Sequence, residues 1–204
     1  MLIFVATPSE FQNLERVTDE LKLPFERRKA PEGEYRDLGL VGTDRVLAVR
    51  TKMGPFGYEG AASRSLVFLS RTQASGVVGL GMAFGTDPTT QKHGDVLVST
   101  GLLPYDYRIV RTKNGDIATD YSEVPRHQAK ESLMELCRAA ADRPEWQKRV
   151  HLGWFLSGGA RIHCSPFRDL LAAARFKAIG LLAETWRALD FFPDLRRTVQ
   201  IGFW

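Results

Sequence analysis

Glu10 stands where a carboxylate could take part in chemistry. It follows the apolar run of residues 2–6 and lies about one turn into a helix that begins after Thr7. A carboxylate there could reach a pocket at the end of the preceding strand and act as an acid or a base. The same residue also fits a structural role, because Thr7-x-x-Glu10 with Pro8 at the first helical position forms a capping box. The residues alone leave both roles open.

Glu184 is a second carboxylate with two possible roles. It lies in the segment AIGLLAETWRAL, residues 178–189. On an exposed helix it would pair with Arg187 three positions later, an interaction worth only about 0.2–0.5 kcal/mol. Composition and spacing do not distinguish that role from a place in a ligand pocket.

Several other chemistries are disfavoured by the pattern. The glycine-rich segment GLGMAFGTDPTTQKHGD, residues 79–95, lacks both the GxGxxG order and the Walker lysine-serine pair of a phosphate loop. Ser157-Gly158-Gly159 lacks the flanking residues of a nucleophile elbow. The four histidines are far apart in the sequence: His93, His127, His151 and His163. We therefore expect no metal site, no cofactor and no serine nucleophile.

Length and composition predict one domain over residues 1–204. The chain has 204 residues with 44% hydrophobic and 25% charged residues, which is typical of a folded globular protein. No apolar run approaches the roughly 20 residues of a membrane-spanning helix. The net charge of +4 is scattered, so a nucleic-acid partner is unsupported. Without an export signal, and with only Cys137 and Cys164 in unrelated contexts, we expect a cytoplasmic protein.

Hydrophobic patterning predicts strands alternating with helices. Strands are expected at residues 2–6, 46–49, 76–81, 95–99, 105–111, 150–156 and 198–204, and helices at 8–23, 58–70, 128–142 and 167–176. The charged stretch from Pro24 to Gly33 is expected to be a surface loop, and Asn114-Gly115 a hairpin turn. This alternation predicts an α/β fold, a three-layer α/β/α sandwich with a central mixed sheet.

Five segments together resemble the nucleoside phosphorylase and nucleosidase superfamily, which includes the methylthioadenosine/adenosylhomocysteine nucleosidases. They are FVATPSEF, MGPFGYEGAAS, GVVGLGMAFGTDPTTQKHGDVLVST, HLGWFLSGGARI and AIGLLAET, in that order along the chain. The most specific is the glycine-rich loop followed by the strand that begins at Gly94-Asp95. Its long form, with Thr86-Asp87-Pro88, resembles a bacterial branch of phosphorylase-like domains found in multidomain signalling or defence proteins.

The resemblance implies cleavage of a ribosyl N-glycosidic bond through an oxocarbenium-like transition state. By position, Glu10 matches the family's glutamate near the attacking water, and Glu184 matches the glutamate that binds the ribose hydroxyls. The loop beside the ribose and base corresponds to Gly81, Met82, Ala83 and Phe84. Arg161 and Ile162 stand where the family places residues that contact the base.

Departures from the family pattern shape the expected activity. Leu182-Ala183-Glu184 replaces the family's Glu-Met-Glu. The arginines that bind phosphate in the phosphorylase branch are replaced by Thr7-Pro8-Ser9 and Val77-Val78-Gly79, which favours hydrolysis over phosphorolysis. The last expected strand, 198–204, ends before the family's acidic residue that protonates the base, so a slow enzyme is expected.

Two functions remain open on this evidence. In the first, the protein is an N-ribosyl hydrolase acting on a purine nucleoside or a related metabolite. In the second, it is a degenerate, non-catalytic member that binds a nucleoside or base, or keeps only the fold. The resemblance also implies a homo-oligomer, at least a dimer. Because the aromatic residues near Phe192 and Trp204 need cover, residues 186–204 are expected at or near its interface.

Overall fold

The computed structural model describes residues 1–52, 59–121, 126–158, 165–171, 178–182 and 198–203. The elements follow one another as β1 (Leu2–Val5), α1 (Pro8–Glu20), β2 (Glu26–Ala30), β3 (Gly33–Val41), β4 (Asp44–Arg50), α2 (Ala61–Thr72), β5 (Val77–Met82), β6 (Phe84–Gly85), β7 (Val96–Pro104), β8 (Ile109–Lys113), β9 (Asp116–Asp120), β10 (His127–Gln128), α3 (Glu131–Ala141), β11 (Val150–Ser157), α4 (Ser165–Leu171), β12 (Gly180–Leu182) and β13 (Thr198–Phe203).

Most of the described strands join one mixed sheet. Its order is β2-β3-β4-β1-β5-β13-β7-β11-β12-β6, with β10 paired to β7. β1 is parallel to both β4 and β5, whereas β13 is parallel to β5 and antiparallel to β7. The predicted α/β fold with a central mixed sheet is therefore confirmed.

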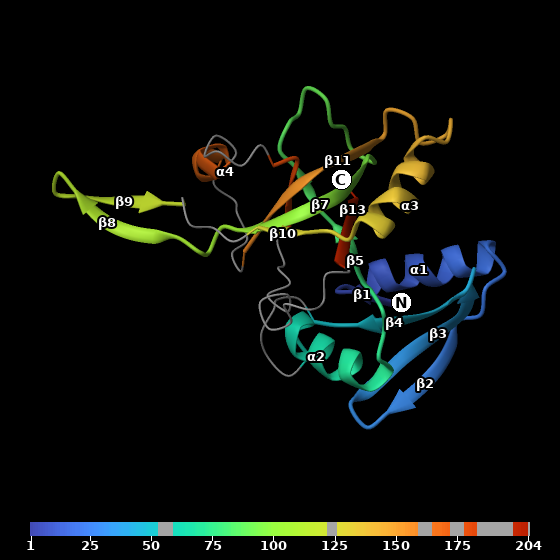
Figure 1. Cartoon of the computed structure of the whole chain (residues 1–204). Helices are drawn as coiled ribbons and strands as arrows, with labels where there is room; N and C mark the ends of the chain where they lie inside the picture. The colour runs from blue at the N-terminus through green and yellow to red at the C-terminus, as the bar shows by residue number, and fades with distance from the viewer. Residues whose placement is uncertain (53–58, 122–125, 159–164, 172–177, 183–197, 204) are drawn as a thin grey trace.

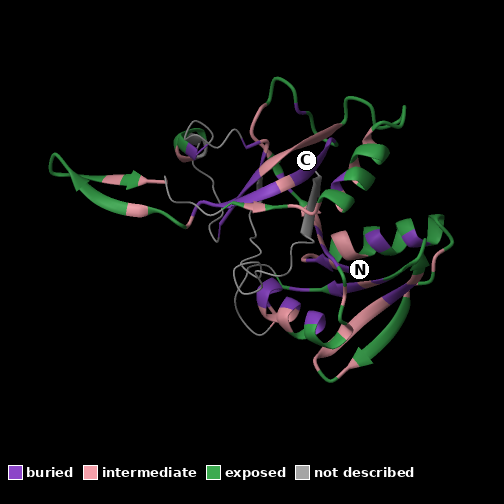
Figure 2. Cartoon of the chain, viewed as in Figure 1, coloured by how far each residue is buried: buried purple, intermediate pink, exposed green. Residues whose placement is uncertain are grey.

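Helices cover both faces of the sheet around β1 (Figure 1). Leu2 and Phe4 point to one face, where they pack in a buried cluster with Phe68 of α2. Val5 points to the other face and packs with Leu14 of α1. The alternation of side chains along a strand produces this division. The run of residues 2–6 is continuously apolar because both of its faces are buried (Figure 2).

The sheet curls back on itself at the end of β5. β6 follows β5 after the single residue Ala83, yet it pairs with β12 at the other end of the strand order. Ala83 is 3% exposed and packs in a cluster with Leu97 of β7 and Phe155 of β11. The curl therefore brings the end of β5 next to β12.

The structure differs from the expected elements in several places, and it contains strands that were not expected: β3, β6, β9, β10 and β12. The stretch expected to be a loop between Pro24 and Gly33 contains β2, which pairs antiparallel with β3. β2 is an edge strand whose side chains are mostly exposed and charged, so no apolar alternation marks it in the sequence. Of the strand expected at residues 105–111, only the last part forms, since β7 ends at Pro104 and β8 begins at Ile109.

β8 and β9 form a separate two-stranded sheet that extends away from the rest of the chain (Figure 1). The predicted turn at Asn114-Gly115 joins them, with positive φ angles of 55° and 88°. Among the described residues, no helix is both long enough and apolar enough to cross a membrane.

Candidate active site at the end of β5

Glu10 is held at the start of α1 by the predicted capping box. Thr7 is the N-cap residue, and its Oγ1 accepts a hydrogen bond from the Glu10 N–H at 3.3 Å. In return, the Thr7 N–H donates to Oε2 of Glu10 at 2.8 Å. This reciprocal pair satisfies two backbone donors that the helix itself leaves unpaired. Glu10 therefore caps helix α1, as the sequence predicts.

The same carboxylate also reaches the end of β5. The backbone N–H of Met82 donates to Oε1 of Glu10 at 2.9 Å, although the two residues are 72 positions apart. The two segments meet because β1 and β5 are parallel neighbours, with Val5 opposite Leu80. Glu10 therefore caps α1 and at the same time lies beside the glycine-rich segment.

The Glu10 carboxylate can accept further hydrogen bonds besides the two from the backbone. Each of its oxygens accepts one described backbone hydrogen bond, whereas a carboxylate oxygen has two lone-pair positions. Glu10 is only partly buried. A carboxylate fixed by two backbone donors and open to solvent is suited to accept a hydrogen bond from a water or a sugar hydroxyl.

Where β5 passes into β6, one buried residue lies between two exposed ones. Ala83 faces the core, whereas Met82 is 67% exposed and Phe84 is 60% exposed. Large apolar side chains flanking a polar group are typical of a ligand site. The structure thus brings Glu10, Gly81 and Met82 together at one edge of the sheet.

Three candidate residues lie outside the described part of the chain: Glu184, Arg161 and Ile162. The preceding strand β12 is described, and its antiparallel pairing sets Leu181 opposite Phe84 and Gly180 opposite Gly85. β6, which follows Met82 after one residue, therefore lies beside β12, and β12 ends two residues before Glu184 in the sequence.

Residues 86–91 clamp this region to the segment before β12. The Gln91 side chain is buried, with its Nε2 donating to the carbonyl of Ile179 at 2.7 Å and its Oε1 accepting from the Asp87 N–H at 2.9 Å. Thr86 adds a hydroxyl bond of 2.5 Å to the carbonyl of Ala178. The sequence does not indicate the contacts of Thr86 and Gln91 with the segment before β12, because these partners lie 92 and 88 positions away.

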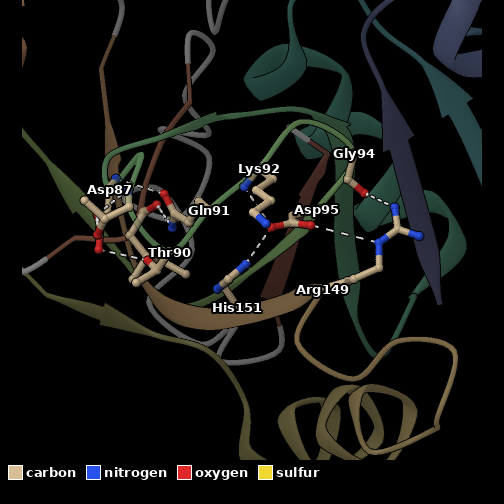
Figure 3. A network of polar contacts seen from close by, with 10 residues as sticks. Asp87, Thr90, Gln91, Lys92, Gly94, Asp95, Arg149 and His151 are labelled. Carbon is tan, nitrogen blue, oxygen red and sulfur yellow. Dashed lines mark hydrogen bonds and ion pairs between the residues drawn. The ribbon is translucent and has the colours of Figure 1, made fainter.

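A second polar network lies at the start of β7 and β11 (Figure 3). Asp95 is 5% exposed, and its Oδ2 lies 2.9 Å from Nε2 of His151 and 2.8 Å from the Lys92 N–H. Burial raises the pKa of Asp95, but the hydrogen bonds from His151 and Lys92 outweigh burial and hold this pKa below its ordinary value. Asp95 therefore anchors the glycine-rich loop as a carboxylate.

Metal binding finds no support in the described residues, where no three His, Cys, Asp or Glu side chains gather closely enough to hold an ion. Ser157 Oγ is buried and has no hydrogen-bond partner among the residues that the structure describes.

Solved structures with the same fold are nucleoside-cleaving enzymes by name. A mutant of Helicobacter pylori MTAN with 5′-methylthioadenosine in its active site matches with a TM-score of 0.75 and 17% identity, over 99% of this chain and 83% of that one. The Campylobacter jejuni 5′-methylthioadenosine/S-adenosyl homocysteine nucleosidase matches with a TM-score of 0.73 and 16% identity, over 99% of this chain and 83% of that one. A futalosine hydrolase mutant of Helicobacter pylori matches with a TM-score of 0.72 and 17% identity, over 99% of this chain and 87% of that one. These likenesses show the fold.

The sequence itself matches a family model as well. No curated protein sequence matches the chain. The model described as the phosphorylase superfamily matches residues 1–184, which include Glu10 and the whole glycine-rich segment. The chain therefore belongs to the phosphorylase superfamily.

Proposed function

We propose that this protein hydrolyses the N-ribosidic bond of a purine nucleoside, with Glu10 placing the attacking water. The observation that carries the proposal is the double anchoring of Glu10 by the N–H groups of Thr7 and Met82. Anchoring at both oxygens fixes the carboxylate before substrate arrives, and such preorganisation is what positioning of a nucleophile requires.

In the proposed reaction, Glu10 accepts a hydrogen bond from the water that attacks C1′ of the ribose. The C1′–N bond breaks with its electron pair moving to the base, and oxocarbenium character develops on the sugar. The water oxygen then bonds to C1′ and loses a proton, while the departing base gains one. A positioned general acid typically contributes about 10²- to 10⁴-fold at such a step. Because Leu182 stands where the family pattern has a glutamate, we expect slow turnover.

The remaining site residues are proposed to bind substrate. Glu184 would accept hydrogen bonds from the ribose hydroxyls, and Arg161 and Ile162 would lie beside the base. Met82, whose N–H binds the Glu10 carboxylate, and Phe84, two residues later, both expose apolar side chains, which fits an apolar part of the substrate.

Hydrolysis is proposed over phosphorolysis from the residue types in the two segments that match the family's phosphate-binding positions. A phosphate dianion is usually held by arginines through paired hydrogen bonds. The residues at the start of α1 are Thr7, Pro8 and Ser9, and β5 begins with Val77-Val78-Gly79. Water therefore remains as the acceptor of the ribosyl group.

The test is release of free base from a panel of nucleosides, measured by chromatography with and without phosphate. The panel is chosen from the substrates that the similar enzymes are named for: 5′-methylthioadenosine, S-adenosylhomocysteine and futalosine, with adenosine and inosine added. We expect release from at least one substrate without phosphate, abolished by Glu10→Gln and retained in Glu15→Gln, which changes an exposed glutamate on the same helix.

Two outcomes would overturn this proposal. Strict phosphate dependence would show phosphorolysis. Tight binding of a nucleoside without release of its base, measured by calorimetry, would instead support the non-catalytic alternative.

A further inference from the structure

Ser157 carries a deeply buried hydroxyl without a hydrogen-bond partner. The residue ends β11, is 0% exposed, and its Oγ forms no hydrogen bond to any atom in the described ranges of the chain. Its backbone carbonyl, by contrast, accepts the N–H of Tyr105 at 2.9 Å. Because a hydroxyl taken out of water without a new partner destabilises the fold, such groups are rare in native proteins, and each needs a reason.

Two other serines with the same burial show the usual arrangement. Ser99 is 2% exposed, and its Oγ donates to the carbonyl of Gly101 at 2.9 Å. Ser65 is 0% exposed, and its Oγ donates to the carbonyl of Ala61 within α2. The missing partner, and not the burial, therefore sets Ser157 apart from these two residues.

The Ser157 side chain lies on the face of the sheet that leads to Glu10. Phe155 stands two residues earlier in β11, so it points to the same face. Phe155 packs with Ala83, the residue between β5 and β6. Ala83 directly follows Met82, whose N–H donates to Glu10. Ser157 is thus on the same face as the passage from β5 to β6, beside which the Glu10 carboxylate lies.

The described neighbours of this hydroxyl on β7 and β11 are apolar. Leu102 and Phe155 face each other across the two strands and are both buried, and Pro104 stands opposite Ser157. Proline has no backbone N–H to offer. A single polar group beside buried apolar side chains is typical of a pocket for a flat, mostly apolar ligand, in which the polar group fixes the orientation.

The end of β11 also leads to residues already proposed to bind substrate. β11 and β12 end side by side, with Ser157 opposite Leu182. From Ser157 the chain continues toward Arg161 and Ile162, and from Leu182 it continues to Glu184. Ser157 therefore lies at the strand end from which the proposed base-contacting residues follow.

We infer that Ser157 binds the purine base of the substrate, and that the base supplies the partner that the hydroxyl lacks among the described residues. The nature of the ligand rests on the proposed function, whereas the choice of Ser157 rests on its unpartnered hydroxyl. A purine is flat, and its edge carries ring nitrogens that accept hydrogen bonds and, in 6-aminopurines, an amino group that donates. A serine hydroxyl both donates and accepts. Ser157 therefore suits 6-amino and 6-oxo purines alike.

The first experiment is urea unfolding of the full chain without ligand. Ser157→Ala removes a hydroxyl that holds no bond, so the midpoint of unfolding should stay at or above that of the wild type. Ser99→Ala removes the matched hydroxyl that binds Gly101, so its midpoint should fall. An equal fall in both variants would show that Ser157 already has a partner, for example an internal water, and would overturn the inference.

The second experiment is calorimetric titration with two free bases, adenine as the 6-amino case and hypoxanthine as the 6-oxo case. The wild type should bind both. Ser157→Ala should raise both dissociation constants about three- to tenfold, which corresponds to the loss of one hydrogen bond, and Ser99→Ala should leave them unchanged. A wild type that binds neither base, or unchanged dissociation constants in Ser157→Ala, would contradict the inference.

Release of base from nucleosides, measured on the same proteins, separates this inference from the proposed function. Release by the wild type together with unchanged base affinity in Ser157→Ala would defeat the role of Ser157 and leave the proposed hydrolysis standing. Weakened base affinity in Ser157→Ala, with no release by the wild type, would support Ser157 as a base-binding residue of a non-catalytic member.

Discussion

Glu10 and Gly81 approach each other so closely that a side chain at residue 81 would crowd the Glu10 carboxylate. A Cβ placed on Gly81 would lie 3.1 Å from Oε1 of Glu10, closer than most real contacts of a Cβ. The same oxygen accepts the N–H of Met82, the next residue in the chain. The glycine at position 81 therefore allows the backbone of β5 to approach the carboxylate.

The first prediction is that Gly81→Ala lowers activity more than stability. The added methyl would push the Glu10 carboxylate by a few tenths of an ångström and weaken its bond to the Met82 N–H. Small misplacements of this kind cost about tenfold or more in rate. The measurements are kcat for base release and the free energy of unfolding in urea. An unchanged kcat would argue that Glu10 does not act on the substrate.

The second prediction separates the cap of α1 from the site. Thr7→Val removes the hydroxyl that accepts the Glu10 N–H, which should cost about 0.5–2 kcal/mol of stability. The Thr7 N–H remains and still donates to Glu10, so kcat should change little. Thr7→Ser keeps the hydroxyl and should restore the stability. Urea unfolding of the three proteins provides the comparison, and equal stability of Thr7→Val and Thr7→Ser would contradict the capping role.

Local rules account for the parts of the structure that the sequence predicts well. The capping box at Thr7 and Glu10, the hairpin turn at Asn114-Gly115 and the buried strand at residues 2–6 each depend on residues close together in the chain. Their determinants are visible in a single sequence because the interacting groups are a few positions apart.

Contacts between distant segments explain what the sequence does not predict. Nothing near Gln91 indicates that its amide binds Ile179, 88 positions later, and nothing near Asp95 indicates His151 as its partner. β2 is hidden for another reason, since an exposed edge strand needs no apolar alternation. Glu10 was predicted from its position after a strand, but its contact with Met82 depends on the parallel pairing of β1 with β5.

The third prediction concerns the clamp between the glycine-rich segment and β12. Gln91→Glu keeps an oxygen for the Asp87 N–H but replaces the Nε2 donor with an oxygen that faces the Ile179 carbonyl. Losing this buried bond should cost about 1–3 kcal/mol at neutral pH. Gln12→Glu, the same change at an exposed position of α1, should stay within about 0.5 kcal/mol of the wild type.

Thermal and urea unfolding at pH 7 check this third prediction. If both variants lost the same free energy of unfolding, the added charge would explain the loss, and the hydrogen bond from Gln91 to Ile179 would not. Because β12 leads toward Glu184, we further expect Gln91→Glu to raise KM for the nucleoside while Gln12→Glu leaves it unchanged.

The last prediction is an acid-dependent loss of stability centred on Asp95. The contacts with His151 and the Lys92 N–H hold the pKa of Asp95 below its ordinary value near 3.8, against the opposing effect of burial. A carboxyl whose pKa is lower in the folded than in the unfolded chain stabilises the fold above the unfolded pKa, and the contribution disappears as the pH falls through the folded pKa. At pH 7, Asp95→Asn should therefore be less stable than the wild type by about 1–3 kcal/mol.

Below about pH 4, that gap should narrow, because the wild-type carboxyl becomes protonated and gives up the same stabilisation. Asp44→Asn, at an exposed position, should stay close to the wild type at both pH values. Urea unfolding of the three proteins between about pH 3 and pH 7 would provide the curves. If the gap between Asp95→Asn and the wild type stayed constant across this range, the ionised carboxylate would not be what anchors the loop, and Asp95 would act through its shape and neutral hydrogen bonds alone.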